Sequence, residues 1–216
     1  MSGVFVTGTG TEVGKTVVAA AIAHTLASEA KRVAVFKPAV TGLEEGGEAD
    51  HDLLRRAAGS QQSDDEIAPY RYGPPMSPHL AAELAGEEIE PARLLASAHA
   101  AASSADALVC EGVGGLLVPL TAGYLVRDFA VDLGLPLVLA ASPGLGTINH
   151  TLLTLEAARA AGLDVQAVVL TPWPEVSGQI EESNHGTIAA LGKVRVETLP
   201  LLDPCRPDSW PRLPIG

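Results

Sequence analysis

Aromatic residues, cationic residues and cysteines are all scarce in this chain. Aromatic side chains make up 4% of its 216 residues, so small aliphatic side chains must build the core, and these suit helices packed closely on a parallel sheet. Lysine and arginine number 14 against 26 acidic residues, a formal net charge of −12 that argues against nucleic-acid or anionic-lipid partners. A nucleotide ligand is still allowed, because salt screens distant carboxylates beyond a Debye length of about 8 Å.

The sequence also shows no disulfide framework, no pattern typical of a signal peptide and no long apolar run. Its two cysteines, Cys110 and Cys205, have no metal-site spacing, which favours a reduced, cytoplasmic setting. The chain opens without a basic region, apolar run and cleavage site, and no apolar stretch reaches the roughly 18 residues of a membrane span. We therefore expect one compact domain over residues 1–216, with no membrane partner.

Short β-type runs alternate with helical stretches along the chain. Strands are predicted at 4–7, 33–36, 107–110, 135–140, 165–170 and 194–199. Helices are predicted at 14–30, 50–58, 77–85, 91–103, 127–133, 147–161 and 176–191. The alternation predicts an α/β fold, a mostly parallel central sheet flanked by helices. Ligands of such folds bind at the carboxyl ends of the strands.

Three other segments are harder to interpret. Residues 116–118 either extend the third predicted strand or form an edge hairpin. Residues 60–78 are polar and proline-rich, and no element is assigned between the helices predicted at 50–58 and 77–85. The acidic run at 43–48 is interpreted as a solvated, mobile turn.

The strongest local signal is the run GTGTEVGKT at residues 8–16. It follows a predicted strand and opens a predicted helix, the context that a phosphate-binding loop requires. Backbone N–H groups and the helix N-terminus would surround phosphate oxygens, Lys15 would reach the β- and γ-phosphates, and the Thr16 hydroxyl would bind Mg²⁺. Five residues instead of four separate Gly8 from Gly14, so the loop is a widened variant.

Charged residues follow the next two strands. Lys37 ends the second strand, where it is either a site residue or a solvated strand-end charge. Glu111 follows the third strand and is interpreted as a metal-supporting carboxylate rather than an incidental residue of a glycine turn. Asp50 and Asp52 stand at the start of a helix, where helix capping and metal binding remain open alternatives. No histidine metal cluster or nucleophile–base pair stands out.

Taken together, four motifs resemble those of the dethiobiotin synthetase family, within the phosphate-loop NTPase superfamily. They are the loop at 8–16, Lys37-Pro38 with Thr41-Gly42, the run 111–115, and the run 146–150 that leads into 153–156. Their order and spacing agree with the family over about the first 160 residues. Beyond Leu170 the resemblance becomes weaker.

The resemblance implies a ligase of biotin biosynthesis that uses ATP and Mg²⁺. One amine of 7,8-diaminononanoate takes up CO₂ to form a carbamate, whose oxygen attacks the γ-phosphate to give a carbamic–phosphoric anhydride. The second amine then closes the cyclic urea of dethiobiotin and expels phosphate. The family works as a homodimer with each site near the subunit interface.

The resemblance also implies residue roles. Lys37 and Lys15 would be catalytic, and Mg²⁺ would be held by Thr16, Glu111 and Asp50, the last preferred to Asp52. The nucleotide would be bound by Glu12, Val13, Gly14, Lys15, Thr16, Val17, Glu111, Gly112, Val113, Gly114, Thr171, Pro172, Pro200, Leu201 and Leu202. The substrate would be bound by Thr41 and, through its carboxylate and from the partner subunit, by Gly146, Thr147, Ile148 and Asn149.

One departure concerns the nucleotide base. The family usually presents an Asn after the strand that ends near Leu170, and this chain has Thr171-Pro172 there. A threonine hydroxyl cannot make the paired donor and acceptor contact of an amide. We therefore predict weak base discrimination, with CTP competing well against ATP.

The main alternative function is a nucleotide-switch ATPase of the same superfamily, acting in partitioning or assembly. Such proteins commonly carry a lysine early in the phosphate loop, where this chain has Gly10, and a basic or amphipathic C-terminal anchor, where it has DSWP at 208–211. Both features count against this alternative. A non-enzymatic nucleotide-binding module and an amide-forming ligase of cofactor synthesis are further alternatives.

Overall fold

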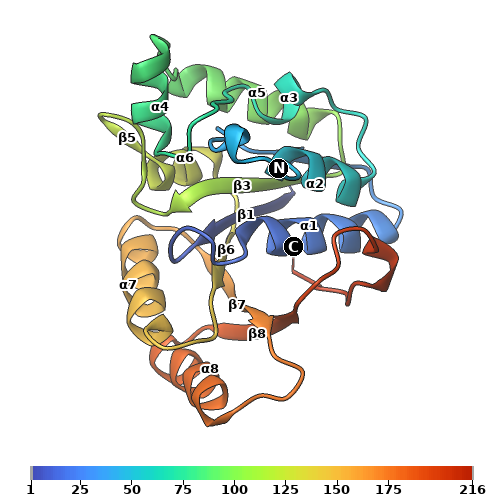
Figure 1. Ribbon diagram of the computed structural model, residues 1–216, viewed down its shortest axis with the longest axis vertical. Coiled ribbons are helices and arrows are strands. Elements are labelled where there is room, and N and C mark those ends of the chain that lie inside the picture. The colour runs from blue at the N-terminus through green and yellow to red at the C-terminus, as the bar shows by residue number, and fades with distance from the viewer. Residues whose placement is uncertain (1, 216) are drawn as a thin grey trace.

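The computed structural model describes residues 2–215, and a six-stranded sheet forms its centre (Figure 1). The strand order is β2-β3-β1-β6-β7-β8, and every neighbouring pair is parallel, which confirms the predicted α/β class. The strands are β1 (Gly3–Gly8), β2 (Val33–Phe36), β3 (Ala107–Gly115), β6 (Leu137–Ala141), β7 (Val165–Trp173) and β8 (Arg195–Pro200).

Helices cover both faces of the sheet because alternate strand residues point to opposite sides. Val4 and Val6 of β1 pack with the first two helices, whereas Phe5 between them packs with Leu94 and Phe129 on the other face. Figure 1 shows α7 and α8 together at the β7–β8 end of the sheet. The main helices are α1 (Lys15–Ser28), α2 (Asp50–Ala58), α5 (Pro91–Ser103), α6 (Val126–Leu133), α7 (Thr147–Ala160) and α8 (Gln179–Gly192).

Shorter elements fill the connections. They are the 3₁₀ turns η1 (Leu43–Glu45) and η2 (Pro207–Ser209), helices α3 (Asp64–Ile67) and α4 (Pro78–Ala85), and the antiparallel hairpin of β4 (Pro119–Thr121) and β5 (Tyr124–Leu125). Helix α3 lies where no helix was predicted. Its signal in the sequence is a capping box, in which the backbone N–H of Ser63 donates to the Glu66 carboxylate.

Two strands run three or more residues beyond their predicted ends. β3 continues through Glu111 to Gly115, which pairs with Gly8, and β7 continues to Trp173, which pairs with Pro200. Glu111 therefore lies inside β3, and Thr171 lies inside β7, whereas both were predicted to follow a strand. A buried strand holds such side chains more rigidly than a loop would.

The C-terminal residues 201–215 pack against α1. Trp210, Leu213 and Ile215 belong to the core on the α1 face, and the Trp210 ring meets His24 edge-on at 5.7 Å between centroids. The backbone N–H of Leu213 donates to Oγ1 of Thr25 at 3.0 Å. This segment therefore completes the core beneath the phosphate-loop helix.

The chain order creates a crevice beside β1. From β1 the chain passes to β2 and returns through β3 on one side, and it then crosses to β6 on the other. The carboxyl end of such a switch point is where open α/β sheets bind ligands. Within residues 2–215, no helix has both the length and the apolar character needed to cross a membrane.

Candidate active site

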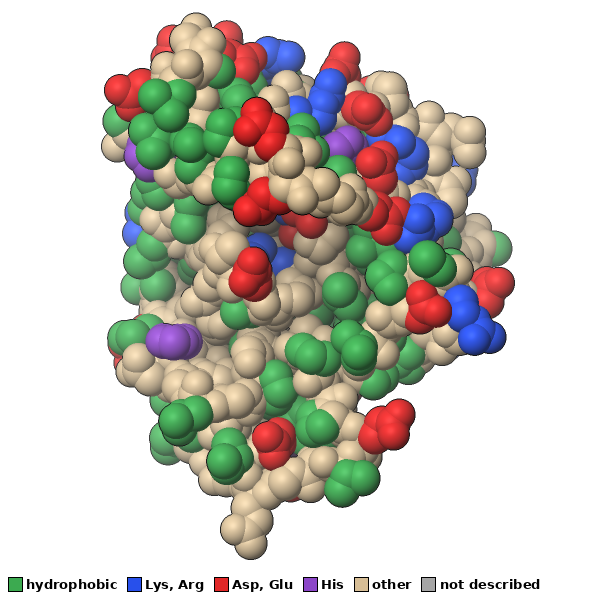
Figure 2. Space-filling model, viewed as in Figure 1, with side chains coloured by type: hydrophobic (Ala, Val, Ile, Leu, Met, Phe, Trp, Pro, Cys, Tyr) green, Lys and Arg blue, Asp and Glu red, His purple; other side chains and the backbone are tan. Residues whose placement is uncertain are grey.

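A cleft of about 450 Å³ opens at the carboxyl ends of β1, β2 and β3. Its lining consists of Thr11, Glu12, Gly14, Lys15, Thr16, Val17, Lys37, Thr41, Glu45, Asp50, Glu111, Val113 and Gly114. Figure 2 shows a hollow near the middle of the visible face, with cationic and acidic side chains inside it. The fold thus brings most of the predicted site residues into one space.

Two lining residues were not predicted as site residues. Thr11 lies within the phosphate-loop motif, so the motif itself was its signal. Glu45 belongs to the acidic run that was interpreted as a solvated turn, and it instead lines the cleft. The turn returns toward the sheet because Val40 pairs with Tyr70 and Tyr72 through backbone hydrogen bonds.

The phosphate loop, residues 9–14, joins β1 to α1. Gly14 precedes the helix with φ 84°, and a Cβ there would lie 2.5 Å from Cγ2 of Thr171. Both the left-handed conformation and the close contact require glycine. The Lys15 ammonium donates to the carbonyl of Gly10 at 2.9 Å, across the loop. Burial lowers the pKa of Lys15, although the charge of Glu111 acts in the opposite direction.

Lys37 forms the centre of a buried ionic group. Its side chain is 3% exposed, and its Nζ lies 2.7 Å from Oε1 of Glu111 and 2.8 Å from Oδ2 of Asp50. Burial alone would lower the pKa of Lys37, but the charges of Glu111 and Asp50 outweigh it and raise the pKa. Lys37 is therefore a protonated side chain of the cleft, and the alternative of a solvated strand-end charge is wrong.

The two carboxylates differ in environment. Burial raises the pKa of the fully buried Glu111, and the charge of Lys37 offsets only part of this effect. Burial also acts to raise the pKa of Asp50, but the charge and hydrogen bond of Lys37 outweigh it and lower the pKa. Asp50 is therefore the carboxylate that stays ionised most readily.

Three oxygens converge beside this ionic group. The Thr16 hydroxyl oxygen lies 2.9 Å from Oδ1 of Asp50 and 2.9 Å from Oε1 of Glu111. One hydroxyl proton cannot serve two carboxylates, and the buried Oε2 of Glu111 has no hydrogen-bond partner within residues 2–215. A hydroxyl and two carboxylates are hard oxygen donors of the kind that Mg²⁺ prefers, so the residues present fit this ion.

The structure distinguishes Asp50 from Asp52. Asp50 is the first residue of α2, after Ala49 at the capping position, and its side chain contacts Thr16 and Lys37. Asp52 instead pairs with Arg55 at 3.0 Å. Asp52 also lies near His51 and Asp64, but Arg55 pairs with both aspartates and already supplies the positive charge of that group.

Other predicted residues lie away from the cleft lining. Gly112 packs inside the sheet against Phe5 and Val126, and Leu202 is buried in the core on the α1 face. Thr171 is buried against Gly14. Pro172, Pro200 and Leu201 are exposed near the ends of β7 and β8, and Gly146, Ile148 and Asn149 stand at the start of α7 with the buried Thr147.

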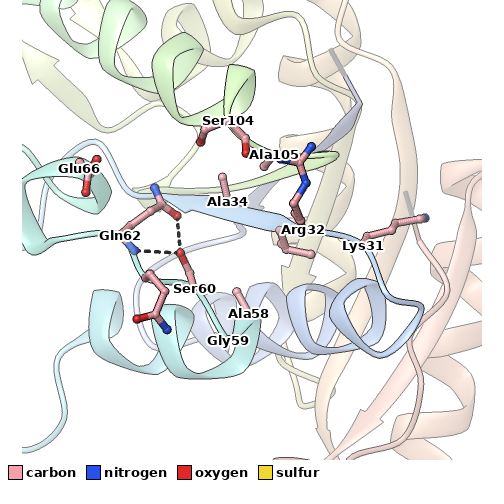
Figure 3. A pocket seen from close by; sticks show the side chains of 12 residues that line it. Lys31, Arg32, Ala34, Ala58, Gly59, Ser60, Gln62, Glu66, Ser104 and Ala105 are labelled. Carbon is pink, nitrogen blue, oxygen red and sulfur yellow. Dashed lines mark hydrogen bonds between the residues drawn. The ribbon is translucent and has the colours of Figure 1, made fainter.

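A second hollow, of about 520 Å³, lies at the opposite end of the strands (Figure 3). Most of its polar side chains are already paired with other protein groups. Arg32 forms an ion pair with Asp106 at 2.8 Å, and the Gln62 side chain bonds both backbone groups of Val35. Within residues 2–215, both cations that line this hollow, Lys31 and Arg32, are paired with carboxylates, whereas the cleft at the phosphate loop holds the buried, unpartnered Oε2 of Glu111.

Comparison with solved structures supports the fold. The chain is similar to a ParA family ATPase from Chlorobium tepidum TLS, with TM-score 0.57, 14% identity, and coverage of 94% of this chain and 86% of that one. It is also similar to the MinC:MinD cell division protein complex of Aquifex aeolicus, with TM-score 0.58, 13% identity, and coverage of 93% and 81%. At such identities the likeness shows the fold alone.

Comparison of sequences shows the family. An AAA domain family model matches residues 2–205. The ATP-dependent dethiobiotin synthetase BioD of Anaeromyxobacter dehalogenans (strain 2CP-C) is 41% identical over 208 residues, covering 96% of this chain and 92% of the relative. The protein of the same name from Bacillus cereus (strain ATCC 14579) is 40% identical over 197 residues, covering 91% and 81%. The chain belongs to the ATP-dependent dethiobiotin synthetase family.

Proposed function

We propose that this chain is an ATP- and Mg²⁺-dependent ligase that converts 7,8-diaminononanoate and CO₂ into dethiobiotin, in the cytoplasm, as a step of biotin biosynthesis. The observation that carries the proposal is the position of the Lys37 ammonium. It lies beside the phosphate loop and between Glu111 and Asp50, in a chain whose family members bear this activity in their names.

The residue types suit a reaction between two anions. A carbamate and a γ-phosphate repel each other, so their approach requires positive charge in a cleft of low dielectric. Lys15 and Lys37 both line the cleft and supply it. One opposed unit charge at 4 Å is worth about 4 kcal/mol at an effective dielectric constant of 20. If this interaction acts only in the transition state, it increases the reaction rate by about three orders of magnitude.

The reaction needs no protein nucleophile. One substrate amine attacks CO₂ and loses a proton, which gives the carbamate. A carbamate oxygen attacks the γ-phosphorus and ADP leaves. The second amine attacks the carbonyl carbon and phosphate leaves, which closes the ring. Lys37 would hold the carbamate against the γ-phosphate, and Thr41, which lines the same cleft, would hydrogen-bond the diamine or carbamate.

A bound Mg²⁺ would neutralise phosphate charge, and Thr16, Asp50 and Glu111 would hold it. The triphosphate would lie along residues 12–17 and 111–114. The base would lie toward Thr171, Pro172 and residues 200–202. The metal and phosphate assignments are supported by the convergence of the loop, β3 and α2 on one cleft. The base assignment is supported by the close approach of Thr171 to Gly14 of the loop.

The far end of the substrate carries a carboxylate. We propose that the N–H groups at the start of α7, residues 146–149, bind it across a homodimer interface. A helix N-terminus attracts an anion through its free N–H groups and its dipole. Two features support an interface here: Leu145 is 97% exposed beside these amides, and Leu153 is exposed on the same helix. Such apolar exposure suits contact with a second copy.

The test is the product. The purified protein is incubated with the diamine, ¹³C-bicarbonate, Mg²⁺ and ATP, and the mixture is examined by mass spectrometry for a ¹³C-labelled cyclic urea. The control omits the diamine. We expect labelled product and ADP only in the complete mixture. ADP release without the diamine, and no cyclic urea, would instead favour a nucleotide-switch ATPase.

A further inference from the structure

Asn184 is a buried amide that bonds a loop far away in the sequence. Asn184 lies on α8 and is only 7% exposed. Its Nδ2 donates to the carbonyl of Pro143 at 2.8 Å and to the carbonyl of Gly144 at 3.1 Å. Both N–H hydrogens of one amide are therefore used on two successive carbonyls.

The loop that Asn184 holds leads directly into α7. It spans residues 142–146, and its other hydrogen bonds within the described residues are local. They run from the Gly144 N–H to Oγ of Ser142 at 3.4 Å, from the Thr147 N–H to the carbonyl of Gly144 at 3.3 Å, and from the His150 N–H to the carbonyl of Gly146 at 3.2 Å. All three are longer than the two bonds from Asn184, so the pair from Asn184 is the firmest restraint on the conformation of the loop.

These bonds also determine where the N–H groups of the loop point. A trans peptide is planar, so its N–H points opposite to its C=O. When the carbonyl of Gly144 turns toward Asn184, the N–H of Leu145 turns away from α8. The carbonyl of Pro143 orients the N–H of Gly144 in the same manner. Asn184 thus fixes the peptide planes between residues 143 and 145, through which the chain enters α7.

We propose that Asn184 is a positioning residue that fixes where α7 begins and thereby orients the N–H groups of residues 146–149 for the substrate carboxylate. The inference rests on the proposed function, since it assigns to these groups the carboxylate of the diamine. Asn184 does not touch the substrate. It acts through the carbonyls of Pro143 and Gly144, so its loss should weaken carboxylate binding and leave the chemistry of the amines intact.

Arg159 provides a matched control. It lies near the end of α7 and donates to the carbonyl of Gly192 at the end of α8, at 2.6 Å. Replacing either Asn184 or Arg159 by alanine therefore deletes hydrogen bonds between α8 or its C-terminal end and the segment that contains α7 and its preceding loop. Only the Asn184 change affects the loop before α7.

The experiment compares wild type, Asn184→Ala, Asn184→Asp and Arg159→Ala with two diamines. One is 7,8-diaminononanoate, and the other is 2,3-diaminononane, which carries a methyl group in place of the carboxylate. For both Asn184 variants we expect KM for 7,8-diaminononanoate to rise about tenfold, equivalent to about 1.4 kcal/mol. The value of kcat and the KM for ATP should stay within about twofold of wild type, and kcat/KM for 2,3-diaminononane should not change. Arg159→Ala should lower Tm without changing any KM.

Two results would overturn the inference while the proposed function stands. One is an unchanged KM for 7,8-diaminononanoate in Asn184→Ala. The other is an equal loss with both diamines, which would make Asn184 merely structural. If Asn184→Asp fails to fold because a carboxylate faces two carbonyls, Asn184→Ser decides between the outcomes. Absence of cyclic urea with the wild-type protein would instead overturn the proposed function, and this inference with it.

Discussion

The Nζ of Lys37 and the Oε1 of Glu111 lie 2.7 Å apart in the interior of the protein. Lys37 directly follows β2, and Glu111 lies in the neighbouring parallel strand β3. The register of these strands pairs Phe36 with Cys110. Each charged residue follows one member of that pair, so the sheet itself brings the two together. An ion pair placed in this way needs no loop to hold its geometry.

Loss of the Lys37 charge should stop the reaction without releasing the nucleotide. In Lys37→Ala, kcat should fall by at least about three decades, the value of one opposed charge in the transition state. ATP binding should persist because Lys15 and the phosphate loop remain. Steady-state kinetics and calorimetric titration with a non-hydrolysable ATP analogue measure the two effects. A variant that keeps more than about a tenth of wild-type kcat, a loss under about 1.4 kcal/mol, would exclude Lys37 from the chemistry.

The Thr16 hydroxyl should control the Mg²⁺ requirement. Thr16→Val keeps the shape of the side chain but removes one of three converging oxygens, so the half-saturating Mg²⁺ concentration should rise by about tenfold or more. Thr25→Val on the same helix is the control. Its hydroxyl bonds Ala21 and Leu213, so its loss should cost about 1 kcal/mol of stability and leave the Mg²⁺ titration unchanged. Equal titrations for wild type and Thr16→Val would contradict the assignment.

Asp50 should make a contribution to stability that disappears in acid. Its pKa in the folded protein lies below the ordinary value of 3.8, because Lys37 outweighs the effect of burial. The stability linked to this shift is fully present above pH 3.8 and is lost as the pH falls through the lower folded pKa. Urea unfolding of wild type and Asp50→Asn should therefore differ more at pH 7 than in strong acid. Asp208→Asn, at an exposed position of η2, supplies the baseline. A difference that grows in acid would show that the sign is wrong.

The enzyme should discriminate only weakly between nucleotide bases. Thr171 stands where the family usually has Asn, and its side chain packs against Gly14. Base discrimination by a paired amide contact is therefore absent at this position. We expect kcat/KM for CTP to approach that for ATP when both are measured with the same diamine. A preference for ATP above about 10³, or about 4 kcal/mol, would refute the prediction.

Local patterns predicted the strands and helices well. The second strand, at 33–36, and the helices at 50–58 and 91–103 have the predicted bounds, because proline or glycine marks one or both ends of each. The cleft could also be predicted, since Lys15, Lys37 and Glu111 lie in motifs that follow predicted strands. Asp50 was found as an acidic residue at the start of a predicted helix.

Contacts between segments far apart in the chain could not be predicted from the sequence. The segment 201–215 is proline-rich and has no periodicity, so nothing indicated that Trp210 would pack on His24 of α1. Glu45 reads as part of a solvated acidic turn, and only the folded loop directs it to the cleft. Asn184 gives no local signal at all, because its partners lie about forty residues away and are backbone carbonyls.

The central claim is that the cleft joins a carbamate oxygen to the γ-phosphorus of ATP, and transfer of an oxygen isotope tests it most directly. The enzyme is supplied with ¹⁸O-labelled bicarbonate, the diamine, Mg²⁺ and unlabelled ATP, and the released phosphate is examined by mass spectrometry. The account predicts one ¹⁸O atom in the phosphate and one in the carbonyl of the cyclic urea. Cyclic urea formed together with unlabelled phosphate would contradict it.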